Sequence, residues 1–343
     1  MGLNIKDIIP RKEIKIADLK GKTVCVDAFN TLYQFLSTIR QYDGTPLMDN
    51  KKRVTSHLSG IFYRNVSMLK EGLKLVYVFD GEAPELKAKT HKKRKQGREL
   101  AETKYEKAKQ SKDIGAMKRY SSQLLRLNNE MIEESKELLQ AMGIQVVQAP
   151  SEGEAEAAHL TKKNEGVYAA VSQDYDSLLF GSPRLIRNLT LARKRKTYTG
   201  YVEVNPELIE LEKVLNNLEI NMEQLICLGI LVGTDYNPKG IPGIGHKKAL
   251  ALVKKFKKPI LIFKEVQQRI HSLPEEDQFN WEDIFELFHQ HDVREVEVKF
   301  PKIDEERIKE ILINRHDFSP DRVEKQLEKL RKIKREAAQK TLF

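Results

Sequence analysis

Val24-Cys25-Val26-Asp27-Ala28 is a short apolar run that ends in an acidic residue, and Tyr77-Val78-Phe79-Asp80-Gly81 repeats the pattern. Runs rich in Val, Tyr and Phe are typical of strands buried in a parallel sheet. In α/β proteins, ligands bind at the carboxyl ends of such strands. The two runs therefore predict an α/β fold with acidic side chains gathered along one edge of its sheet.

Strand-like and helix-like segments alternate on either side of these runs. The expected strands cover residues 22–28, 75–80, 144–149 and 167–172, and the expected helices cover 29–39, 54–71, 151–163, 222–232, 249–256 and 323–338. This alternation predicts a doubly wound, mostly parallel sheet with helices on both faces.

More acidic residues stand in three further motifs, Ser151-Glu152-Gly153-Glu154, Asp174-Tyr175-Asp176 and Gly233-Thr234-Asp235. Carboxylates that converge repel by ~4 kcal/mol per pair at about 4 Å and an effective dielectric near 20, so such a cluster needs cations. Oxygen ligands select Mg²⁺ or Mn²⁺, and two such ions support in-line hydrolysis of a phosphodiester. The sequence therefore predicts a nuclease whose metal ligands are Asp27, Asp80, Glu152, Glu154, Asp174, Asp176 and Asp235.

A purely structural interpretation competes for part of this set. Ser151-x-x-Glu154 has the pattern of a helix capping box, a stabilising device of about 1 kcal/mol. The capping box does not account for Glu152, and no helix cap needs both acids of Asp174-Tyr175-Asp176. We therefore favour metal ligation for these four carboxylates. The eight histidines have no ligand spacing, and no nucleophilic Ser or Cys site is recognisable.

The formal charge of +10 is concentrated in one region of the chain. Residues 86–126 hold 14 Lys and Arg against 4 Asp and Glu, in a helical pattern over 85–110 and 116–142 that is broken near Gly115. A solvated charged hairpin is the simpler interpretation. We instead expect a basic cover, or arch, over the sheet edge that binds a polyanion. Lys87 and Arg94 share one helical face just after Asp80, within reach of a substrate phosphate.

A glycine-rich loop, Gly240-Ile241-Pro242-Gly243-Ile244-Gly245, joins two short helical patterns and is followed by Lys247 and Lys248. Glycines let backbone N–H groups approach a phosphate closely, and the two lysines add positive charge. A plain linker is the alternative, but the combination favours duplex DNA bound without regard to sequence. Tyr33, on the helix after Asp27, either packs in the core or stacks on a base.

These motifs, in this order and over nearly the whole chain, resemble the flap endonucleases of the structure-specific 5′ nuclease superfamily, most closely the archaeal form. The resemblance implies two Mg²⁺ ions, with Mn²⁺ as a substitute, held by the seven carboxylates. It also implies that Lys87 and Arg94 stabilise the scissile phosphate, that Tyr33 stacks on an unpaired base, and that Thr55 lies at a pocket for a one-nucleotide 3′ flap. The loop with Gly243 and Gly245 would belong to a helix–turn–helix element that commonly holds K⁺.

The domain boundaries implied by the resemblance are a single nuclease domain over 1–326, with the arch inserted at 82–142 and the helix–turn–helix element at 220–258. The tail over 327–343 resembles a sliding-clamp motif in Gln339, Leu342 and Phe343, but the family places two aromatic residues where this sequence has one. We expect the sliding clamp as a partner of the biological protein and an incomplete clamp motif in this sequence.

The expected function is cleavage at the base of 5′ flaps with an accompanying 5′ exonuclease activity, in lagging-strand maturation and base-excision repair. The alternatives are a 5′ exonuclease or junction resolvase of the same superfamily, and a binder of DNA junctions without catalysis. The binder would have lost its carboxylates, and none is missing. The resemblance implies an archaeal protein that acts on flap, nicked and branched DNA, and we expect it to be a monomer. We expect it to be intracellular, because the sequence has no signal peptide or membrane span and its two cysteines lie in apolar runs.

Overall fold

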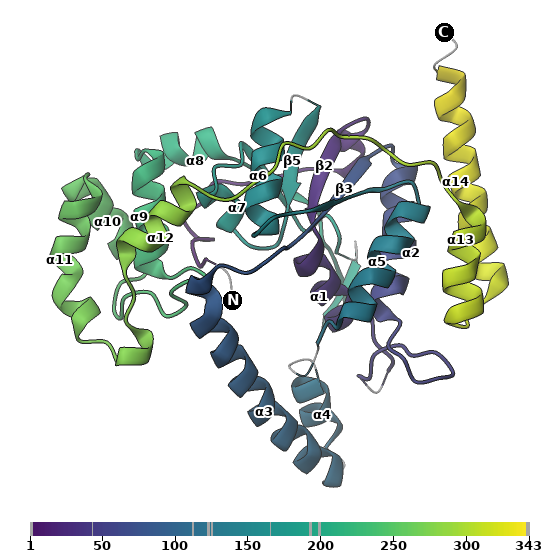
Figure 1. Cartoon of the computed structure of the whole chain (residues 1–343), viewed down its shortest axis with the longest axis horizontal. Coiled ribbons are helices and arrows are strands. Elements are labelled where there is room, and N and C mark those ends of the chain that lie inside the picture. The colour runs from purple at the N-terminus through teal and green to yellow at the C-terminus, as the bar shows by residue number, and fades with distance from the viewer. Residues whose placement is uncertain are drawn as a thin grey trace. The chain divides into compact units, whose positions relative to one another are not determined.

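The computed structural model describes residues 3–42, 44–111, 113–121, 124, 126–164, 166–191, 194–197 and 200–340 (Figure 1). Its contacts divide the chain into two compact units, each assembled from three stretches. The first unit holds Met1–Ile14, Val78–Arg94 and Gln148–Val296, and the second holds Lys15–Tyr77, Lys95–Val147 and Glu297–Phe343. The single domain over 1–326 remains a prediction.

The first unit carries four strands of the main sheet in the order β1-β9-β6-β5. Their bounds are β1 Lys12–Glu13, β5 Val167–Val171, β6 Arg184–Arg187 and β9 Glu207–Glu210. Strands β5 and β6 are parallel, with Val171 opposite Ile186, whereas β9 is antiparallel to both β6 and β1. The sheet is therefore mixed, and the expected strand over 167–172 is confirmed. A separate antiparallel hairpin joins β7 (Lys194–Thr197) to β8 (Gly200–Glu203).

Helices complete the first unit, and most of them pack around one apolar helix. These helices are α6 Gly153–Lys163, α7 Asp176–Leu179, α8 Leu211–Leu218, α9 Met222–Val232, α10 His246–Phe256, α11 Pro259–His271 and α12 Trp281–His289. Helix α9 is buried almost all round and contacts α7, α10, α11 and α12, which Figure 1 shows gathered beside it. It has the bounds that the sequence predicts.

The second unit carries β2 (Thr23–Asp27) and most of β3 (Lys74–Phe79) and β4 (Gln145–Gln148), which stand in the order β2-β3-β4. All five residues of β2 are buried, as the apolar run predicts. The helices are α1 Ala28–Thr38, α2 Ser56–Lys70, α4 Ile114–Ser121, α5 Asn129–Ala141, α13 Glu305–Lys309 and α14 Pro320–Lys340, with a π-helical turn over Glu310–Arg315. Helix α2 packs against α1, α5 and α14.

The helix expected over 116–142 is wrong in one respect, because it is two separate helices. Helix α4 ends at Ser121, and α5 begins at Asn129, where the side chain of Asn128 accepts a hydrogen bond from the Met131 N–H at 2.8 Å. An Asn that caps a helix start competes with the continuation of a preceding helix. Helix α5 then buries Leu138 and Leu139 and packs on α2, so it belongs to the core of its unit.

The basic helix α3 (Ala88–Gln110) begins in the first unit and lies mostly in the second. Most of its described side chains are exposed, and among them only a few small ones, such as Ala101 and Ala108, are buried. The ammonium of Lys104 lies 5.9 Å from the ring centre of Tyr120 on α4, and Figure 1 shows α3 and α4 side by side. The helical pattern expected over 85–110 is confirmed by α3, whereas the expected role of the basic helices as a cover remains a prediction.

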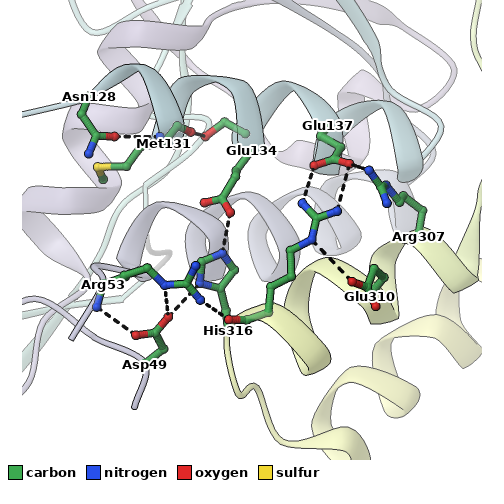
Figure 2. A network of polar contacts seen from close by, with 11 residues as sticks. Asp49, Arg53, Asn128, Met131, Glu134, Glu137, Arg307, Glu310 and His316 are labelled. Carbon is green, nitrogen blue, oxygen red and sulfur yellow. Dashed lines mark hydrogen bonds and ion pairs between the residues drawn. The ribbon is translucent and has the colours of Figure 1, made fainter. Parts of the chain in front are cut away.

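A buried polar network ties distant stretches of the second unit together (Figure 2). The ring of His316 is 1% exposed and lies between two carboxylates, with Nδ1 3.1 Å from Asp49 Oδ2 and Nε2 2.8 Å from Glu134 Oε1. Carboxylates accept and do not donate, so the ring matches its partners as a double donor. Asp49 also accepts from Arg53 Nε at 2.8 Å. Burial alone would raise the pKa of Asp49, but the hydrogen bonds from Arg53 and His316 lower it below its usual value.

Asp49→Asn should lower the free energy of unfolding at pH 7 by about 1–3 kcal/mol, because it leaves buried donors of Arg53 and His316 without a carboxylate. The native pKa is below the unfolded one, so the carboxylate stabilises the fold above the unfolded pKa of about 3.9, and this contribution is lost as the pH falls further. The difference in urea unfolding between wild type and variant should thus narrow below about pH 4. The exposed Asp321→Asn is the control, and equal stability of Asp49→Asn and wild type at pH 7 would contradict the assignment.

Two smaller expectations concern the cysteines and the membrane. Cys25 and Cys227 are both free and buried, as expected. Within the described part of the chain, no helix has both the length and the apolar character that a membrane crossing requires.

Candidate metal centre

Six of the seven predicted metal ligands belong to the first unit. Asp80 follows β3, Glu152 and Glu154 lie at the start of α6, Asp174 and Asp176 follow β5, and Asp235 follows α9. Asp27 lies in the second unit, at the end of β2, where its Oδ1 caps α1 by accepting from the Asn30 N–H at 3.0 Å.

Asp80 and Glu152 come together because the residue after Glu152 is a glycine that bonds Asp80. The Gly153 N–H donates to Asp80 Oδ1 at 2.7 Å. A Cβ at position 153 would lie 2.6 Å from that oxygen, closer than real Cβ atoms approach another heavy atom. Only glycine permits this approach, so Gly153 fixes the start of α6 against the end of β3.

Lys87 is the cation of this cluster. Its ammonium bonds Glu152 Oε2, lies 3.8 Å from Asp235 Oδ2, and sits 5.6 Å from the ring centre of Tyr236. Burial lowers the pKa of Lys87, but the neighbouring Glu152 and Asp235 outweigh it and raise the pKa above its ordinary value. The ammonium therefore remains charged at every working pH.

The pKa of Glu152 is also raised, which for a carboxyl group favours the neutral form. Burial raises its pKa above the ordinary value, and the carboxylates of Asp80 and Asp235 add to this effect, which Lys87 only partly reverses.

Ser172 connects the second pair of acids. Its hydroxyl donates to Glu154 Oε1 at 3.0 Å and accepts from the Asp174 N–H at 3.2 Å. The capping box considered for α6 does not form: the helix begins after Glu152, and no side chain caps it. Glu154 is directed to Ser172, a residue at the end of β5, so the tertiary contact prevails over the local one.

Asp176 is a strongly perturbed carboxyl of the site. It is 5% exposed, and its Oδ1 has no hydrogen-bond partner. Burial and the neighbouring Asp235 and Asp174, which Lys87 only partly offsets, together raise its pKa to about 8. A buried carboxyl that faces other carboxylates is typical of a functional site, because the fold gains nothing from this arrangement.

The donor set fits divalent cations. It consists of carboxylate oxygens, the ligands that Mg²⁺ and Mn²⁺ prefer, and it leaves a buried oxygen of Asp176 without a donor. Among the described residues, no three or more His, Cys, Asp or Glu side chains form a ready-made metal cage. Asp80, Glu152 and Glu154 are each turned to a donor of their own, namely Gly153, Lys87 and Ser172.

The remaining predicted site residues are placed as follows. Arg94 lies on α3, but its side chain is outside the described residues. Tyr33 is 39% exposed on α1, which argues against core packing. Thr55 is 4% exposed and is the residue before α2, where its backbone N–H donates to Leu47 O at 2.8 Å.

The glycine loop joins α9 to α10, as the helix–turn–helix prediction requires. Gln224 of α9 donates from Nε2 to Val253 O of α10 at 2.7 Å and so fixes the two helices to each other. Gly243 has a φ of +77°, a conformation that L side chains rarely adopt, and Gly245 is the residue before α10. Lys247 is exposed, whereas Lys248 donates to Gly243 O at 3.1 Å and holds the loop.

Three residues of the site were not singled out by the sequence analysis. Ser172 orients Glu154, Tyr236 lies beneath Lys87, and the Thr90 hydroxyl donates to the backbone oxygen of Asp235 at 2.7 Å. Tyr236 directly follows Asp235, so its place in the sequence could have marked it as a residue of the site. Ser172 and Thr90 depend on contacts between residues far apart in the sequence, and nothing local marks them.

Comparison with known proteins shows which family this chain resembles. The XPG N-terminal domain family matches residues 4–101, and the XPG I-region family matches residues 143–235. Flap endonuclease 1 of Pyrococcus furiosus is 49% identical over 100% of this chain and 98% of its own length, and that of Nanoarchaeum equitans is 50% identical over the same shares. The solved flap endonuclease-1 of Methanococcus jannaschii is 38% identical, with a TM-score of 0.72 over 97% of this chain and 98% of that one. The chain therefore belongs to the XPG-type structure-specific nucleases, and within them to the flap endonucleases.

Proposed function

We propose that the chain cleaves the phosphodiester at the base of 5′ flaps with two Mg²⁺ ions, which Mn²⁺ can replace. In the first unit, Asp80, Glu152, Glu154, Asp174, Asp176 and Asp235 hold them, whereas Asp27 stays a ligand predicted from the sequence alone. The observation that carries the proposal is Asp176, a buried carboxyl beside Asp174 and Asp235 whose Oδ1 has no hydrogen-bond donor. When bound, the two ions activate water and stabilise the leaving oxygen of an in-line displacement.

The protein's own groups bind and orient the scissile phosphate. The Lys87 ammonium is charged and held by Glu152, so it supplies a fixed positive charge at the edge of the carboxylate cluster. A preorganised charge of this kind stabilises negative charge that develops on phosphate oxygens. Arg94, which lies on α3 seven residues after Lys87, supplies the second positive charge. The buried ring of Tyr236 lies 5.6 Å from the Lys87 ammonium.

DNA is held outside this centre. The exposed glycine loop at Gly243 and Gly245, with Lys247, binds the backbone of downstream duplex and carries K⁺. Tyr33 stacks on an unpaired base near the cut, and Thr55 lies at the 3′-flap pocket. The basic helices α3 and α4 cover the flap. Unpairing of terminal nucleotides costs a few kcal/mol, which confines cleavage to ends and junctions.

Removal of metal gives the direct test. Double-flap DNA with a 5′ flap and a one-nucleotide 3′ flap should be cut once, at the flap base, with Mg²⁺, and should remain intact with EDTA. The labelled products would be a flap ending in a 3′-hydroxyl and a duplex nicked at a 5′-phosphate. Binding without any cut would favour a junction binder, and stepwise release of mononucleotides from blunt ends would favour a 5′ exonuclease.

The C-terminal tail is the proposed contact to a sliding clamp. Gln339 lies in the last turn of α14, whereas Leu342 and Phe343 lie outside the described residues. Clamp binding through these three residues, and a monomeric enzyme on DNA, stand as proposals.

A further inference from the structure

Arg187, at the end of β6, contacts the loop at which two of the proposed metal ligands lie. The loop runs from β5 to α7 and includes Asp174, and Asp176 is the first residue of α7. Arg187 Nε donates to the Gln173 backbone oxygen at 3.0 Å, and Nη1 donates to the Tyr175 hydroxyl at 2.6 Å. The guanidinium carbon also lies 4.4 Å from the ring centre of Tyr175. The Arg187 side chain thus bonds Gln173, which precedes Asp174, and Tyr175, which precedes Asp176.

Arg187 is itself held from the other side. It faces Glu207 across the antiparallel pair β6–β9, and Nη1 lies 3.3 Å from Glu207 Oε2. Glu207 also pairs with Arg11 Nε at 3.4 Å. The Arg187 side chain is 15% exposed. A planar guanidinium that is fixed by the sheet can bond in two directions at once, which a lysine ammonium does with far less geometric control.

We propose that Arg187 is a positioning residue that sets the directions of Asp174 and Asp176 and thereby the affinity of the centre for divalent cations. This inference rests on the proposed function. Residues beyond the ligands commonly fix ligand orientation, and their loss typically weakens metal affinity by about 10–100-fold. Tyr175 is buried, so its ring and hydroxyl transmit the position of Arg187 to the backbone between the two acids.

Arg184, on the same strand, provides a matched control. Its guanidinium carbon lies 4.8 Å from the ring centre of Tyr168, and Nη1 donates to the Tyr168 backbone oxygen at 3.4 Å. It therefore makes the same two kinds of contact as Arg187, but to a residue within β5 that precedes the acidic loop. If these arginines only stabilised the sheet, substitution of Arg184 and of Arg187 would have the same effect on metal affinity. If Arg187 positions the ligands, only its substitution weakens metal affinity.

The test compares Arg187→Gln with Arg184→Gln in the full chain. The affinity for Mn²⁺ is measured without DNA from the electron paramagnetic resonance signal of the free ion. It should be about 10-fold weaker in Arg187→Gln than in wild type and unchanged in Arg184→Gln. The Mg²⁺ concentration for half-maximal flap cleavage should rise by a similar factor. Excess Mg²⁺ should restore most of the rate, and flap-DNA affinity in EDTA should match wild type. The Mn²⁺ affinity of Arg187→Lys should also stay low, because an ammonium cannot reproduce the two directed hydrogen bonds of the guanidinium.

Tyr175→Phe covers the case in which Arg187→Gln does not fold. It keeps the ring and removes only the hydroxyl, and should shift the Mn²⁺ affinity in the same direction by a smaller factor. Unchanged Mn²⁺ affinity in a folded Arg187→Gln protein, or an equal shift in Arg184→Gln, would overturn the inference. Failure of the wild type to bind Mn²⁺ or to cleave flaps would instead refute the proposed function, so the two failures are distinguishable.

Discussion

Asp176→Asn should reduce the rate of flap cleavage by at least about a thousandfold. Metal ions supply several kcal/mol of transition-state stabilisation, and each 1.36 kcal/mol is a factor of ten in rate. The substitution keeps the volume of the side chain but removes the ionisable carboxyl that lies buried beside Asp174 and Asp235 and that would bind a metal ion as its anion. Binding of flap DNA should be retained, since the basic arch and the glycine loop are untouched. Single-turnover cleavage and fluorescence anisotropy measure the two quantities.

The same substitution should stabilise the fold in the absence of metal. The native pKa of Asp176 is about 8, well above the unfolded value, so the native state keeps a proton that the unfolded state releases. Wild type in EDTA therefore loses stability as the pH rises from about 4 to about 8, and Asp176→Asn does not. The variant should melt above wild type at pH 8, and the difference should vanish near pH 4. This is the exchange of stability for activity that functional sites show.

Asp283→Asn, at an exposed aspartate of α12 in the same unit, is the control for both measurements and should match wild type. Retained cleavage in Asp176→Asn would remove this residue from the metal centre. A variant that loses cleavage and DNA affinity together would indicate that the substitution disturbs the fold of the site.

The parts of the structure that depend on local burial could be predicted from the sequence. Strand β2 and helix α9 lie where their apolar runs predict, because a segment with apolar residues on every side has few alternatives to the interior. The acidic residues after β3 and β5 were found in the same way. A parallel strand in a covered sheet is marked by composition alone, and its last residue marks the ligand-binding edge.

The parts that depend on contacts between distant residues could not be predicted. One local feature was also missed: Asn128 caps the start of α5, and the similar charge pattern on both sides hides the break between α4 and α5. The direction of Glu154 is decided by Ser172, 18 positions away, and overrides a plausible capping box. Arg187 has no sequence signal at all, since its importance follows from the pairing of β6 with β9 and β5.

Lys87→Met should lower the cleavage rate by about 10²–10³-fold, the usual effect of removing one preorganised charge from a site where negative charge develops. Methionine keeps an unbranched side chain and removes the ammonium that lies 5.6 Å from the ring centre of Tyr236. The affinity for flap DNA should change far less, because one phosphate contact among many contributes little to a duplex complex. A large loss in rate with nearly constant affinity is the kinetic signature of an interaction made in the transition state.

Lys239→Met is the matched control, because it removes one positive charge from an exposed ammonium of the same unit that pairs with Asp277. If Lys87 acted only through the general attraction of DNA, the two variants would lose affinity and rate by the same small factor. An equal loss of rate and affinity in Lys87→Met would assign the residue to simple phosphate contact. A loss of rate alone would place its charge at the scissile phosphate, where Glu152 and Asp235 hold the ammonium.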